Sequence, residues 1–348
     1  MSNATQFYVT TLLIYGAVSI IACWGLDLQF GDTGILNFAF IMFQAAGAYT
    51  AAVLTLGPST QSNPLSNYQH YVFGASVPYP VSVFAAALVG ALLSYPIGVV
   101  ALRRLRSDYQ AVAMLVVSLI ATTVVISDTG LLDGERGLFL IPKPLRDSAD
   151  TLLGYQWLYV GISCVFLAVV LWVIARISRA PLGRSLRAIR ESESAAAALG
   201  KNVLSLRMGA FVVGNMIAAI SGALLVQYIG SWSPNGWLYP ETFVYLGAII
   251  IGGAANKLGV LIGALLLPVG ISEGVRYLPS FGGPGFVDAV QFMLIGVLII
   301  AFMWFRPRGL VPERRRTFGN PRWSFRRRTP GAGVATAMPS ADEQGLAG

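Results

Sequence analysis

The 348-residue chain is 55% hydrophobic and only 11% charged, with a mean hydropathy of +0.66 and a formal net charge of +8. A water-soluble protein has roughly 25% charged residues, because polar side chains must cover its surface. These values exclude an ordinary soluble protein and indicate an integral membrane protein whose apolar segments face lipid.

Apolar runs follow one another along almost the whole chain, and most approach the length of about 20 helical residues that crosses a bilayer. They lack the strict alternation of apolar and polar residues that is typical of barrel strands. We therefore predict an all-α, polytopic transmembrane helix bundle of about 8–10 spans. The runs occupy residues 8–26, 34–56, 80–102, 109–127, 155–175, 207–229, 242–255, 258–272 and 286–305.

The second run is compatible with two structures. In a continuous helix Asn37 and Gln44, seven residues apart, share one polar face. In a broken, re-entrant segment the same residues line a cavity. Residues 1–102 contain no Lys or Arg that would orient this part of the chain, so the sequence leaves both structures open.

Polar side chains within the spans are candidates for a solute pathway, because an unsatisfied polar group in hydrocarbon is costly and usually faces a cavity or a partner helix. A structural hydrogen bond between helices explains each of them equally well. The candidates for the substrate pathway are Asn37, Gln44, Asn215 and Gln227.

Positive charge predicts the orientation of the bundle. Twenty of the 24 Lys and Arg residues fall within 103–106, 176–207, Lys257 and 306–328. Because short cytoplasmic loops carry the excess of positive charge, we expect these segments and the C-terminus in the cytoplasm. Residues 128–151 are expected on the opposite side.

The chain changes character after residue 312. We predict a transmembrane permease domain over residues 1–312 and a basic, disordered cytoplasmic tail over 313–348. The tail is rich in Arg and lies next to the membrane, which favours contact with anionic membrane lipid and argues against nucleic acid as its partner.

The cytoplasmic loop 176–206 is predicted to contain two short helices. Pro181 suits the first turn of one helix, and Ser192 is a natural N-cap for the next. Glu193 favours the positive end of that second helix, and Gly200 can end it in the left-handed conformation. From the residues alone, a lipid-headgroup anchor and a protein contact are both consistent with this basic, amphipathic unit.

The pattern from Gly183 to Glu191, followed by an Ala-rich stretch and Gly200, closely resembles the cytoplasmic loop of LivM-type permeases of branched-chain amino acid ABC importers. The resemblance covers residues 12–312. Further similar segments occur in the same order at residues 36–40, 47–52, 105–109, 141–144, 233–234, 252–253, 259–263 and 305–310.

The resemblance implies a permease subunit, without enzyme activity, in a bacterial or archaeal cytoplasmic membrane. It implies a second related permease (LivH type), two cytoplasmic ATPases that use ATP, and an extracytoplasmic solute-binding protein as partners. No cofactor or metal is expected on this chain, and a phosphate-binding GxxxxGK[ST] loop is absent from its sequence. The ATPase-coupling residues implied are Gly183, Arg184, Leu186, Arg187, Ala188, Arg190, Glu191, Ala195, Ala196, Ala197, Leu199 and Gly200.

The solute is the least determined property. Branched-chain amino acids are the expectation that the resemblance implies, while related permeases move urea or short amides. Residues 129–138 depart from the family's usual external loop, because Asp133, Glu135 and Arg136 replace small or amide residues. A secondary carrier or channel that works alone is the alternative class, although the spans lack clear coupling charges.

Overall fold

The computed structural model describes residues 3–58, 69–148, 151–276, 286–307 and 309–313. One compact unit covers Met1–Glu313, and the second unit, Arg314–Gly348, lies outside the described residues. The prediction of a disordered basic tail therefore also falls outside them.

Within the described residues the fold is all-α, as predicted, and its only β-type pairings are two isolated bridges. The helices of the first half are α1 (Asn3–Phe30), α2 (Phe40–Leu56), α3 (Tyr79–Arg104), α4 (Ser107–Ser127), α5 (Thr129–Leu132) and α6 (Leu152–Arg179). Those of the second half are α7 (Pro181–Glu191), α8 (Glu193–Ala198), α9 (Val203–Ile229), α10 (Pro240–Gly252), α11 (Lys257–Ala264), α12 (Ser272–Arg276) and α13 (Phe286–Phe305).

Six helical stretches of the described chain are long and apolar enough to cross a membrane. They are Asn3–Phe30, Tyr79–Arg104, Tyr109–Ser127, Leu152–Arg179, Val203–Ile229 and Lys257–Arg276. Shorter apolar helices cover Phe40–Leu56 and Ala289–Phe305. A helix with this composition is stable in lipid because its backbone polar groups are satisfied within the helix. The protein is therefore a multi-pass membrane helix bundle.

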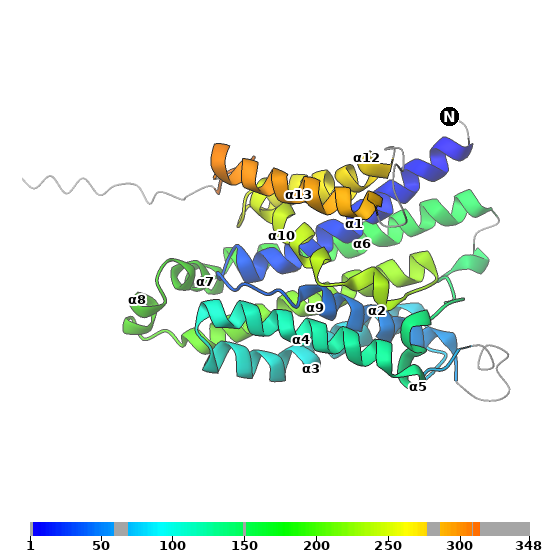
Figure 1. Ribbon diagram of the computed structural model, residues 1–348, viewed down its shortest axis with the longest axis horizontal. Coiled ribbons are helices and arrows are strands. Elements are labelled where there is room, and N and C mark those ends of the chain that lie inside the picture. Colours follow the sequence, from blue (N-terminus) through cyan, green and yellow to red (C-terminus); the bar gives the residue numbers. More distant parts are fainter. Residues whose placement is uncertain (1–2, 59–68, 149–150, 277–285, 308, 314–348) are drawn as a thin grey trace, which may run out of the picture. The chain divides into compact units, whose positions relative to one another are not determined.

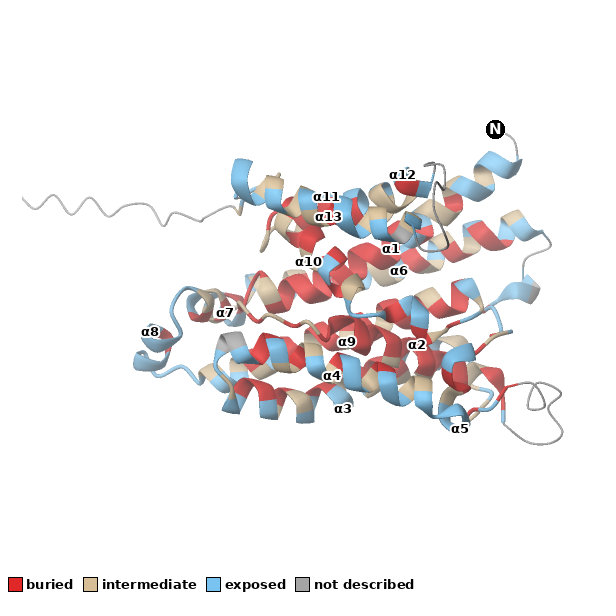
Figure 2. Ribbon diagram, in the orientation of Figure 1, coloured by how far each residue is buried: buried red, intermediate tan, exposed pale blue. Residues whose placement is uncertain are grey.

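The centre of the bundle is formed by α9, which packs closely against both α1 and α2. In Figure 2 these helices carry most of the buried residues, whereas α3, α4 and α13 expose one face. Exposed apolar side chains such as Leu88 on α3 and Ile300 on α13 suit the hydrocarbon of a membrane. The bundle thus has a protein-packed interior and an apolar outer surface.

Two glycines explain why α2 and α9 approach so closely. A Cβ atom on Gly47 would overlap the backbone of Ala219, and one on Gly222 would overlap the carbonyl of Gln44. Gly259 and Gly263 likewise lie against the backbones of Gly252 and Ala248. Small residues allow such contact between membrane helices.

The second apolar run is not one continuous helix. Residues 34–37 are not helical, and α2 begins only at Phe40. The interpretation that Asn37 and Gln44 share one helical face is therefore wrong: Asn37 lies in the non-helical segment and Gln44 in α2. Gly34, with φ of 77°, has the left-handed backbone that permits the change of direction.

The two ends of the bundle differ in structure. At one end α7 and α8 project beyond the long helices, and at the opposite end lie α5 and the start of α1 (Figure 1). The α3 helix ends with Arg103 and Arg104 in its last turn, and α6 ends with Arg176 and Arg179. Both helices thus end in basic residues, within the segments 103–106 and 176–207 that the charge pattern predicts to be cytoplasmic.

Candidate functional site

The helix α7 begins where its sequence predicts. Pro181 occupies the first turn, where its missing N–H costs no hydrogen bond. Leu186 and Ile189 are buried against the bundle, and Gly183 lies so close to α6 that a Cβ atom would overlap the backbone of Ser178. One face of α7 is therefore fixed to the chain, while Arg184 and Ala188 on other faces are exposed.

Two arginines of α7 bind groups within the chain. Arg190 forms an ion pair with Glu313 at 2.7 Å, and its other terminal nitrogen donates to the carbonyl of Gly31. Arg187 lies 3.8 Å from the same carboxylate and donates to the carbonyl of Ser178 at 3.1 Å. Both side chains were predicted as ATPase contacts. In the structure they form ion pairs and hydrogen bonds with other parts of the same chain.

Glu313 is in turn held by the connection between α10 and α11. The N–H groups of Leu310 and Val311 donate to the carbonyls of Ile251 and Gly252 at 2.8 and 3.0 Å. Asn256 donates to the carbonyl of Pro312 at 3.1 Å. Through the segment that ends at Glu313, α7 is thus linked to the end of α10 and to the turn that precedes α11.

Acidic residues after the apolar part of α1 join the same cluster. Asp27 is buried and accepts a 2.8 Å hydrogen bond from the backbone N–H of Ala255, in the turn between α10 and α11. Burial raises the pKa of Asp32, and the nearby Arg187 and Arg190 oppose that shift. The sequence analysis missed both carboxylates, although acidic residues next to a span were a signal for them.

The short helix α8 is capped as expected but is less firmly attached. The Ser192 hydroxyl accepts from the N–H of Ala195 at 3.3 Å, and Gly200 has φ of 76°. Glu193 forms an ion pair with Arg207 at 3.1 Å. Within α8 itself only Ala196 is buried.

The remaining small residues of α8 form an exposed surface that we call the α8 face, consisting of Ala195, Ala197, Ala198 and Leu199. Leu199 is 81% exposed. Glu191, at the end of α7, is exposed beside it and has no ion pair within the described chain. Apolar and small side chains that are exposed at a polar membrane boundary are typical of a protein contact.

Two of the four pathway candidates belong to a buried amide network. Asn37 donates to Oε1 of Gln29 at 2.8 Å and to Oδ1 of Asn215 at 3.0 Å, and Gln29 donates to Asn215 at 2.9 Å. The network joins α1, the non-helical segment and α9. Gln29 was missed because the first apolar run was placed at 8–26 and ended before it.

The other two candidates also bind neighbouring helices. Gln44 donates to the hydroxyl of Tyr245 at 3.3 Å, and Gln227 donates to the hydroxyl of Ser82 at 2.9 Å. The Oε1 atoms of both glutamines are buried without a partner in the described structure. The substrate-pathway assignment of the four side chains stays a prediction, since interhelical hydrogen bonds explain most of their polar groups.

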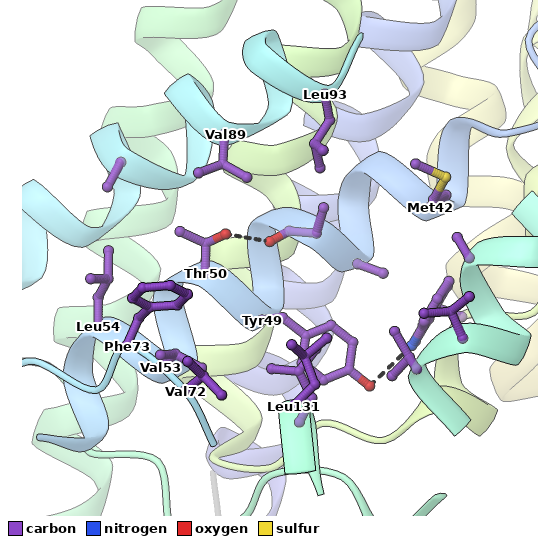
Figure 3. Close-up of a pocket in the computed structure, with 18 of the residues that line it drawn as sticks. Met42, Tyr49, Thr50, Val53, Leu54, Val72, Phe73, Val89, Leu93 and Leu131 are labelled. Atoms are coloured by element: carbon purple, nitrogen blue, oxygen red, sulfur yellow. Dashed lines mark hydrogen bonds between the residues drawn. The ribbon is translucent and has the colours of Figure 1, made fainter. Parts of the chain in front are cut away.

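A cavity with a volume of ≈ 640 Å³ lies between α2, α3, α4 and α5. Figure 3 shows its apolar walls, with Phe73, Val89 and Leu131 around the outer half of α2. Its hydroxyls are already paired: Thr50 donates to Ala46 at 2.7 Å, and Tyr49 accepts from Trp237 at 3.3 Å. The cavity suits aliphatic groups and offers no charge.

The chain is a multi-pass helix bundle with a projecting, capped helix pair at one end (Figure 1). A family model described as the permease component of branched-chain amino acid transport systems matches residues 8–303, so the chain belongs to that family of ABC import permeases. No solved structure matches the chain.

Relatives occur in bacteria and archaea. The high-affinity branched-chain amino acid permease LivM of Escherichia coli is 28% identical over 90% of this chain and 72% of its own length. A probable LivM of Methanocaldococcus jannaschii is 23% identical over 88% of this chain and 94% of that protein. LivH of Salmonella typhimurium is 24% identical over 85% of this chain and 92% of that protein. These relatives are transport permeases.

Proposed function

We propose that this chain forms half of the translocation pathway of an ATP-driven importer for branched-chain amino acids or similar small polar solutes. The observation that carries the proposal is the α7 and α8 pair. It combines an anchored helix with an exposed face of small side chains, on a chain that the family model matches from residue 8 to 303.

The importer would contain a second related permease, two cytoplasmic ATPases and an extracytoplasmic solute-binding protein. Similarity to both LivM and LivH relatives supports the permease partner. In this proposal ATP is hydrolysed by the ATPase subunits, and the present chain is not an enzyme and binds no cofactor. The exposed apolar faces of α3 and α13 contact lipid, and nucleic acid is not a partner.

Energy would pass from the ATPase to the spans through the ionic contacts of α7. Nucleotide-driven movement of the ATPase displaces the α8 face and α7 as a rigid body. Arg190 then transmits the displacement to Gly31 after α1, and through Glu313 to the turn between α10 and α11. The displacement could thus reach the spans through these contacts as well as through the chain itself, which joins α7 to α6 and α8 to α9.

The protein would lie in a bacterial or archaeal cytoplasmic membrane, with the C-terminus, α7 and α8 in the cytoplasm. The charge pattern and the position of α7 and α8 opposite α5 support this orientation (Figure 1). In a variant whose exposed Cys164 is replaced, a cysteine at position 199 should be labelled by an impermeant reagent only in opened cells. Labelling in intact cells would reverse the orientation.

The function is tested by purifying the tagged chain from its native host and identifying the bound proteins. We expect a second permease and ATPase subunits. Vesicles containing the complex and its binding protein should take up L-[14C]leucine only with ATP. ATP-independent uptake by the chain alone would support the carrier alternative. Uptake of labelled urea and of a labelled nucleoside is measured in the same way. A nucleoside is included because a Lactococcus lactis relative is a nucleoside permease.

A further inference from the structure

A groove with a volume of ≈ 510 Å³ lies between the last turns of α3 and the first turns of α9. Arg103, in the last turn of α3, and Asn202, the N-cap of α9, line the same end of it. This is the end of the bundle that the charge pattern predicts to be cytoplasmic. The groove opens to the outside of the bundle, since Tyr95 in its wall is 61% exposed.

The groove extends from the polar end of the bundle into its apolar part. Its lining residues run from Arg103 back to Tyr95 on α3, and from Asn202 to Val212 along α9. These eight and ten helical residues rise by about 12 and 15 Å. The hydrocarbon of a bilayer is about 30 Å thick, so the groove has roughly the depth of one lipid leaflet.

The polar end of the groove offers positive charge and hydrogen-bond donors. Arg103 is exposed and has no ion pair within the described chain. The Oδ1 atom of Asn202 accepts from the N–H of Ser205 at 3.1 Å, which leaves the amide nitrogen as a donor. None of the lining residues is acidic. This end therefore suits an anion, and a guanidinium matches the oxygens of a phosphate group particularly well.

The deeper part of the groove is apolar. Val99, Leu204 and Met208 line it, and Gly209 leaves it open, because a Cβ atom there would meet no other atom within 4 Å. Such a surface takes an aliphatic chain without loss of hydration. The two parts together match a molecule with a phosphate at one end and a long hydrocarbon chain at the other.

Other cavities of the described chain lack this combination. The cavity of Figure 3 has no charged lining residue, and a cavity of ≈ 330 Å³ between α3 and α4 is lined only by apolar side chains. A protein partner in the cytoplasm could meet Arg103, but it would not enter the apolar part, which lies at the depth of the hydrocarbon. Arg104 and Arg106 add positive charge nearby, which favours an anionic over a zwitterionic lipid.

We propose that this groove is a binding site for one anionic phospholipid. Arg103, Asn202 and Ser205 bind the phosphate, and an acyl chain lies between α3 and α9. The bound lipid connects the end of α3 to the start of α9, directly after α8. This inference requires only that the chain is a membrane helix bundle, and it is independent of the solute and of the ATPase.

The test is native mass spectrometry of the purified full-length chain, titrated with phosphatidylglycerol or with phosphatidylcholine. The wild type should bind its first phosphatidylglycerol at least fivefold more tightly than phosphatidylcholine. Arg103→Gln should weaken phosphatidylglycerol binding by about fivefold. Arg104→Gln is the matched control, because it removes the same charge from the next residue, which does not line the groove. Equal losses in the two variants would show diffuse surface attraction and overturn the site.

The apolar part is tested without a change of charge. Gly209 on α9 and Gly161 on α6 are both exposed glycines with open space at the Cβ position, so leucine fits at either. Gly209→Leu fills the groove and should weaken phosphatidylglycerol binding severalfold, whereas Gly161→Leu should not. Thermal unfolding without added lipid shows that both variants are folded. Equal lipid affinities of the two variants would contradict an acyl chain between α3 and α9.

The same titration is repeated on the chain with its bound partners, purified from the native host. The phosphatidylglycerol site should persist, with the same difference between Arg103→Gln and Arg104→Gln. Loss of the site in the complex would show that a partner chain covers the groove and would overturn the proposal. A chain that binds the lipid but imports no amino acid would contradict the proposed function and leave the lipid site standing.

Discussion

The two short helices α7 and α8 differ in how they are attached to the bundle. The α7 helix buries Leu186 and Ile189 and is tied by Arg190 to Gly31 and Glu313. The α8 helix buries only Ala196. Apart from its capping hydrogen bonds, it is held by one ion pair, between Glu193 and Arg207, and the Glu193 side chain is 59% exposed. In the proposed importer this difference corresponds to two tasks: α7 would transmit a displacement to the spans, and α8 would present a surface to the ATPase.

The largest effect is expected on the α8 face. Ala197→Trp places a bulky ring on an exposed position, so the permease should still fold while its co-purification with the ATPase falls by about tenfold or more. Cys164→Trp, at an exposed position of α6, is the control and should leave co-purification unchanged. Equal co-purification of both variants would show that α8 is not the contact surface.

A smaller effect is expected at Glu191. Glu191→Arg reverses an exposed charge without an ion pair in the described chain, so ATPase association should fall severalfold at unchanged thermal stability. Arg187→Glu should lower both quantities, because it places a second carboxylate beside Glu313. Thermal unfolding measured with co-purification distinguishes the two residues. Loss of stability in Glu191→Arg would contradict its placement as a contact residue.

The tie between α7 and the spans is tested by Glu313→Gln. The substitution weakens the ion pair with Arg190 and leaves the α8 face unchanged, so ATPase binding should persist while solute uptake per ATP hydrolysed falls by about two- to fivefold. Glu241→Gln, on α10 away from the cluster, serves as the control. An unchanged ratio of uptake to hydrolysis would exclude Glu313 from coupling.

The smallest effect is expected in the amide network. Asn37→Leu removes donors to Gln29 and Asn215, and each interhelical hydrogen bond in a membrane protein contributes about 1–2 kcal/mol or less. The thermal stability of the complex should therefore fall. Solute uptake is measured on the same preparations. Reduced uptake at unchanged stability would instead support Asn37 as a pathway residue.

Elements with a local signal were predictable from the sequence. Pro181, Ser192 and Gly200 mark the ends of α7 and α8 by backbone chemistry, and the structure has them in those roles. Long apolar runs likewise predicted the six long apolar helices of the described chain, because length and hydropathy are local properties.

Features that depend on distant contacts were not predictable. At the break before Phe40, Asn37 binds Gln29 of α1 and Asn215 of α9, and the sequence alone left a broken and a continuous segment both open. The tie of Arg190 to Glu313 joins residues 123 positions apart. A single sequence does not show which of many charges such an arginine meets.

Photocrosslinking from position 197 tests the central claim most directly. A photoreactive benzoylphenylalanine at that position, in the assembled importer, should form a covalent adduct with the ATPase, while the same residue at position 164 should not. Efficient transport by the labelled complex, with no ATPase adduct from position 197 and adducts only with lipid, would contradict the assignment of α8 as the surface that receives the ATPase.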